Sequence, residues 1–213
     1  MKFTHRSMFA LAAIAMLSAT PAMADAPAAT PAKEAQLSEF APFGVTQNSD
    51  LETLGCTVFE DDLYDCKGLP EKNAMFGAYT VETRSGPRDG ICNVTAYSQV
   101  FRGDRTGWQV TKAYEKLAVL LGRKYGPATS EKNSNAAGNS VGYQSADQFA
   151  AAVKAGVKQF SKEWTNSPAV LPHGTSITMK MVATSDEKTF VELNYFFGGP
   201  GCSTEEDQAL RGL

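Results

Sequence analysis

Histidine is scarce in this sequence, with two in 213 residues. His5 lies in the N-terminal segment, so the rest of the chain holds only His173. A metal site with two histidine ligands is therefore excluded from that part. His173 is also the one candidate there for a histidine that activates a serine or cysteine nucleophile. His173 stands in a loop before a predicted strand, and no nucleophile elbow is visible. We expect no catalytic histidine, no metal site and no cofactor.

A basic stripe and a long apolar run are also missing. Lysine and arginine number 20 against 23 acidic residues, a net charge of -3, and the two signs are interspersed along the chain. Nucleic acids and anionic membrane surfaces attract proteins with clustered basic residues, so we expect neither as a partner. No stretch after the first 24 residues approaches the roughly eighteen consecutive apolar residues of a membrane-spanning helix, so we expect no membrane span.

What is present begins with the three-part pattern of a secretory signal peptide over residues 1–24. Lys2 and Arg6 are basic, residues 8–17 (MFALAAIAML) are apolar, and Ala22-Met23-Ala24 supplies small residues for a signal peptidase. As a helix the apolar run rises only about 15 Å, half of a bilayer core of about 30 Å, which disfavours a membrane anchor. We expect cleavage after Ala24 and a soluble protein that is periplasmic or secreted.

The remainder divides into a linker and one domain. Residues 25–37 are rich in alanine and proline and nearly free of large apolar side chains. They bury too little surface to offset the entropy of ordering, so we expect a disordered linker. Residues 38–213 have a length typical of a single domain with its own core.

Four cysteines, an even number, indicate disulfides in an exported chain. Their spacing lacks C-x-x-C and fits neither a zinc site nor a redox pair. The segment from Cys56 to Cys66 is symmetric about the acidic residues 60–62, so a hairpin with its turn there places the two cysteines opposite each other. This pairing leaves Cys92 for Cys202. A calcium loop in the same acidic segment is disfavoured, because the twelve-residue ligand pattern with its central glycine is absent.

The hydrophobic pattern predicts three hairpins and two amphipathic helices. The hairpins span residues 56–67, 79–101 and 177–195, and in the last one Met181 should pair with Val191 and Met179 with Leu193. A capping box at residues 106–109 opens one helix, which ends at residues 126–127. A second box at residues 145–148 opens another helix. Its apolar stripe is expected at Phe149, Val153, Gly156, Phe160 and Trp164.

These elements predict an α+β fold. We expect a single domain in which a curved antiparallel sheet, built from hairpins, carries the two helices on one face and is held by two disulfides. Residues 129–144 are polar and should form a long loop between the helices. A short C-terminal helix is expected after Ser203.

For function, the missing catalytic set predicts a non-enzymatic protein that binds another protein or a cell-envelope component. An aromatic patch is expected on the sheet face opposite the helices, at Tyr97, Phe101, Phe190 and Phe196.

Two alternatives stay open. One is a carboxylate-dependent hydrolase in which Glu82 and Glu192 meet in a cleft. The other is a carrier for a small apolar ligand, with a cavity between sheet and helices. The side chains expected around that cavity are Leu117, Leu121, Phe149, Val153, Met179 and Leu193.

Overall fold

The computed structural model describes residues 40–86, 89–135, 145–165, 171–172, 174–198 and 202. These residues belong to one compact unit that begins at Leu37. The expected signal peptide, the whole of the expected linker, His173 and the expected C-terminal helix lie outside the described residues, so these expectations stay predictions.

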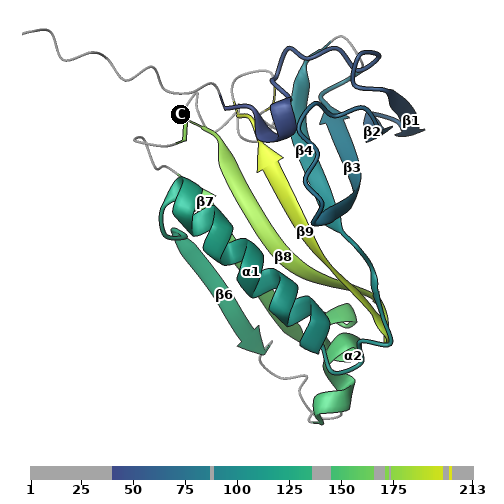
Figure 1. Ribbon diagram of the computed structural model, residues 1–213, viewed down its shortest axis with the longest axis vertical. Helices are drawn as coiled ribbons and strands as arrows, with labels where there is room; N and C mark the ends of the chain where they lie inside the picture. Colours follow the sequence, from purple (N-terminus) through teal and green to yellow (C-terminus); the bar gives the residue numbers. More distant parts are fainter. Residues whose placement is uncertain are drawn as a thin grey trace, which may run out of the picture. The chain divides into compact units, whose positions relative to one another are not determined.

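In the described part of the chain, nine strands form one antiparallel sheet with the order β1-β2-β3-β4-β9-β8-β7-β6, and β5 pairs with β9 as well (Figure 1). The strands are β1 (Cys56–Glu60), β2 (Leu63–Cys66), β3 (Phe76–Thr83), β4 (Ile91–Ser98), β5 (Phe101–Arg102), β6 (Ser130–Asn135), β7 (Lys158–Thr165), β8 (Ser176–Ser185) and β9 (Lys188–Phe196). The helices are α1 (Trp108–Tyr125) and α2 (Phe149–Lys154), with short 3-10 turns at Pro42–Gly44 and Ala146–Gln148. The expected α+β class is therefore confirmed, with two helices and a mostly antiparallel sheet. The curvature expected of the sheet stays a prediction.

The last strand, β9, joins the two halves of the sheet. It pairs with β4 on one side and with β8 on the other. The β8–β9 register places Met181 opposite Val191 and Met179 opposite Leu193, as the alternation predicts. These four side chains are buried, so the register is fixed by the apolar face that it presents to the core.

Helix α1 covers this apolar face. Its buried residues recur at helical spacing and belong to one core cluster with the buried residues of β8 and β9. They are Val110, Tyr114, Leu117, Leu121 and Tyr125. Trp164 in β7 belongs to the same cluster and is 1% exposed. Its indole N–H donates a hydrogen bond to the carbonyl of Gly126, the residue after the helix. No helix in the described part of the chain is long and apolar enough to span a membrane.

The second predicted helix is wrong beyond its first turns. Helix α2 ends at Lys154, Gly156 has a φ of 71°, and the chain then forms β7. Phe160 and Trp164 lie four residues apart, a spacing that places side chains on one face of a helix and also on one face of a strand. The expected apolar stripe therefore fitted both a helix and a strand. Gly156 marks the point where the helix ends.

The long polar loop expected at residues 129–144 is also wrong in part. Residues Ser130–Asn135 form the edge strand β6, which pairs with β7 from Ser130–Glu163 to Asn135–Lys158. Its sequence, SEKNSN, has no apolar residue and hence no alternation to detect. Polar and charged residues are typical of edge strands, where they discourage pairing with other chains.

Two disulfides crosslink the chain, one at the β1–β2 end of the sheet and one at the central strand β4. Cys56 is joined to Cys66 across the β1–β2 hairpin, with Cα atoms 4.0 Å apart. Cys202 is joined to Cys92 at the start of β4, with Cα atoms 5.1 Å apart. Structural disulfides of this kind indicate an oxidising compartment outside the cytoplasm.

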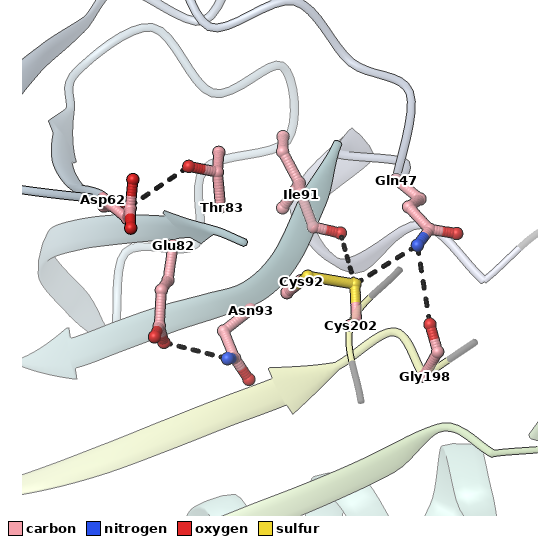
Figure 2. The surroundings of a disulfide bond; sticks show 9 residues. All are labelled: Gln47, Asp62, Glu82, Thr83, Ile91, Cys92, Asn93, Gly198 and Cys202. Carbon is pink, nitrogen blue, oxygen red and sulfur yellow. Dashed lines mark hydrogen bonds between the residues drawn. A yellow bond between two sulfur atoms is a disulfide. The ribbon is translucent and has the colours of Figure 1, made fainter. Parts of the chain in front are cut away.

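Gln47 reinforces the second disulfide (Figure 2). Its side-chain amide donates to Cys202 Sγ at 3.3 Å and to the carbonyl of Gly198 at 3.5 Å. Its backbone carbonyl accepts from the N–H of Ile91 at 2.8 Å. The segment that precedes β1, the start of β4 and the residues after β9 are therefore bound together around one covalent link.

Buried tyrosines make the fold sensitive to alkali. Burial raises the pKa of the Tyr195 phenol above its ordinary value of 10.0, and the neighbouring Tyr125 raises it further. Burial also raises the pKa of Tyr114. A group whose pKa is raised on folding stabilises the fold below its unfolded pKa and loses that contribution as pH rises. We therefore expect the free energy of unfolding to fall above about pH 10, and Tyr195→Phe to remove part of this fall.

Urea unfolding at several pH values between about 8 and 11 measures the effect. Tyr97→Phe, on the other face of the sheet, is the matched control. Parallel pH curves for the wild-type protein and Tyr195→Phe would contradict the assignment.

Candidate ligand-binding groove

A groove runs along one side of α1 and consists of two adjoining cavities of about 470 Å³ and about 370 Å³. Both cavities are lined by Ala74 and Leu117, so they are continuous along the helix. The opposite wall is the segment before β3 in the first cavity and the end of β4 with β5 in the second. The lining residues span most of α1, and eighteen helical residues measure about 27 Å.

The floor of the groove is apolar and rigid. In the first cavity it is made by residues of the core cluster, whose aromatic rings pack edge to face. They are Phe43, Phe76, Leu117, Leu121, Leu193 and Tyr195. In the second cavity it is made by Met75, Phe101 and Ala113, which pack against the same cluster. Because these side chains are anchored in the core, the floor is formed before any ligand arrives.

The rim of the groove is cationic. Lys72 and Lys124 line the first cavity and Lys112 and Lys116 the second, against one acidic residue, Glu71. All four lysines are exposed, and among the described residues none of them forms an ion pair. This local excess of positive charge contrasts with the net charge of -3 of the whole chain.

Two large apolar side chains beside these lysines are exposed to solvent. Trp108 is 66% exposed in the second cavity and Leu120 is 40% exposed in the first. The Lys112 ammonium lies 5.1 Å from the centre of the Trp108 ring, a cation–π contact that orients both groups. An exposed tryptophan next to a half-apolar groove is typical of the anchor positions of protein interfaces.

The cavity expected for a small-ligand carrier is found only in part. Leu117, Leu121 and Leu193 line the first cavity of the groove. Met179 is fully buried in the core, and neither Phe149 nor Val153 lines the groove. The groove is therefore open to solvent along α1. A site for a small apolar ligand differs, because it normally encloses roughly 70–90% of the ligand surface.

The carboxylates named for a hydrolase do not meet. Glu82 pairs with Asn93, which pairs with Phe196, four residues along β9 from Glu192. Standard strand spacings put the two Cα atoms roughly 16 Å apart. Glu82 accepts a hydrogen bond from the Asn93 amide, and Glu192 forms an ion pair with Lys180 at 2.8 Å. Both lie on the sheet face opposite α1, and they are not the carboxylate pair that the hydrolase expectation needs.

Three of the four aromatic residues expected on that opposite face lie there. Tyr97 and Phe190 pack together there with ring centres 6.0 Å apart, and they line a cavity of about 370 Å³. Phe196 is half-buried on the same face. Phe101 was wrongly assigned, because it packs against the core and lines the groove along α1.

No group of three potential metal ligands occurs within the described residues. Glu60 ends β1, Asp61 and Asp62 form the turn to β2, and Asp65 contacts Lys67 at 3.8 Å.

Sequence reasoning missed the groove, although its signal is present. Trp108, Lys112, Lys116, Leu120 and Lys124 recur every four residues, so they form a stripe along α1 beside its buried face. In the linear sequence Glu115 and several apolar residues stand between the lysines, and only the packing of α1 shows that Glu115 does not line the groove. Comparison with known proteins finds no matching family, no matching curated protein and no matching solved structure.

Proposed function

We propose that this protein is an exported, non-enzymatic binding protein whose site is the groove along α1. The partner is a protein segment that presents apolar side chains flanked by carboxylates. The observation that carries this proposal is the combination of a rigid apolar floor with four lysines that form no ion pair within the described residues.

The shape of the groove favours a protein segment over a small ligand. A strand or helix of a partner can bind along an open, elongated groove, with its side chains in the two cavities. Trp108 and Leu120 would become buried and supply most of the affinity, since desolvated aromatic and aliphatic anchors dominate interfaces. The lysines at the rim would add orientation and a faster association, because solvent-exposed ion pairs are individually weak.

Selection from a displayed library of short peptides tests the proposal. We expect the full chain to enrich peptides that combine aromatic or aliphatic residues with aspartate or glutamate. A labelled consensus peptide should bind about tenfold more weakly to Lys112→Glu/Lys116→Glu, a loss of about 1.4 kcal/mol. Raising the salt concentration should weaken binding to the wild-type protein as well.

The matched control is Lys132→Glu/Lys188→Glu, which reverses two exposed lysines on β6 and β9, away from the residues that line the groove. It should bind the peptide as the wild-type protein does. Enrichment without acidic residues, or equal binding by the two double variants, would refute the proposal. Displacement of the peptide by a single-stranded oligonucleotide would instead indicate a general anion-binding surface.

A further inference from the structure

The tip of the β1–β2 hairpin is the most exposed apolar feature of the described chain. Val58 is 70% exposed and Phe59 is 68% exposed, and both belong to the edge strand β1. An edge strand with uncovered apolar side chains tends to pair with another surface. Within the described part of the chain, the tip therefore has the character of an uncovered contact surface.

The same tip is acidic and rigid. Glu60 and Asp61 are exposed and Asp62 is half-buried at the turn. The Cys56–Cys66 disulfide closes the base of the hairpin. A preformed tip loses little conformational entropy when it docks.

The tip has the chemistry that the groove along α1 is proposed to recognise. It offers two apolar side chains followed by three carboxylates, whereas the groove offers an apolar floor and four lysines against one glutamate. The two surfaces are complementary in charge and in polarity.

The tip does not occupy the groove of its own chain. None of residues 58–62 lines either cavity, and the disulfide at the base of the hairpin holds the tip in place. Figure 1 shows β1 and β2 at one side of the sheet and α1 over the region of β8 and β9. A contact between tip and groove must therefore join two copies.

We infer that a second copy of this chain docks the tip of its β1–β2 hairpin in the groove along α1. The inference rests on the proposed use of the groove as a protein-docking site, and it names a partner for that site. Two copies that each dock a tip in the other's groove form an isologous dimer. Copies that dock head to tail make a heterologous contact, which gives a ring when it closes and a longer chain of copies when it does not.

Sedimentation of the full exported chain between about 1 µM and about 1 mM tests the inference, a range that covers the affinities of weak protein contacts. The average mass should rise with concentration and fall when salt is added. Phe59→Ser, Glu60→Lys/Asp61→Lys and Lys112→Glu/Lys116→Glu should each stay monomeric. Val119→Ser is the control, since Val119 is exposed on α1 but does not line the groove.

Mixing the two charge-reversed variants is the decisive step. The reversed tip and the reversed groove are complementary again, so the mixture should associate although each variant alone does not. A wild-type protein that stays monomeric at about 1 mM, or association that none of the tip variants changes, overturns the inference. Peptide selection is unaffected by that result, so the proposed function would stand by itself.

Discussion

We expect the Cys92→Ala/Cys202→Ala variant to lose about 4.7 kcal/mol of unfolding free energy, because this disulfide closes a loop of 110 residues. A crosslink stabilises a protein mainly by restricting its unfolded chain, and the restriction grows with the length of the closed loop. Natural domains have only about 5–15 kcal/mol in total, so this variant should lose about a third or more of its stability. Urea unfolding followed by circular dichroism measures the change.

The second disulfide provides the control for this prediction. Cys56 and Cys66 are only 10 residues apart, so Cys56→Ala/Cys66→Ala should lose about 3 kcal/mol or less. Equal losses for the two variants, or a larger loss for the short loop, would show that loop length does not determine the stabilisation here. In that case, the contacts of Gln47 with Cys202 and Gly198 would be the first candidates for a compensating interaction.

Asp104→Ala should lower the free energy of unfolding by about 3 kcal/mol, because a buried carboxylate with several hydrogen bonds is removed. Asp104 is 2% exposed and accepts from the N–H groups of Gln109 and Val110 at 3.0 Å and from the Thr189 hydroxyl at 2.7 Å. It therefore caps the first turn of α1 and ties that turn to β9. Negative charge is also favourable at a helix N-terminus.

Thr189→Val separates the two roles of Asp104. It removes the bond to β9 and keeps the cap, so it should lose about 1 kcal/mol. Thermal unfolding of both variants, with peptide binding measured in parallel, tests the assignment. Since the capped turn carries Trp108 and precedes Lys112, Asp104→Ala should also weaken binding in the groove. An Asp104→Ala variant as stable as Thr189→Val would show that the cap contributes little.

The capping residue of α1 illustrates where sequence reasoning reaches its limit. The box at residues 106–109 predicts the correct start of the helix, but no side chain caps it from there. Gly107 has a φ of 71°, and this turn brings Asp104 rather than Thr106 to the free N–H groups. Sequence spacing showed that a helix begins here, and only the left-handed turn determines which residue caps it.

Elements with strong alternation could be predicted, and elements without it could not. Alternating apolar residues gave the β8–β9 register, and the paired cysteines coincide with the pairs expected from the first hairpin. Strand β6 has no apolar residue, and the spacing of Phe160 and Trp164 fits two kinds of element. The groove depends on the side of α1 that faces the segment before β3, which is a tertiary property. Local sequence patterns do not contain that information.

The two tryptophans of the chain occupy opposite environments, and this gives the protein two built-in optical reporters. Trp164 is enclosed in the core and should emit at short wavelength until the sheet opens. Trp108 stands in water at the groove and should emit at longer wavelength until something covers it. Intrinsic fluorescence can therefore follow occupation of the groove and loss of the fold as separate signals in one unlabelled sample.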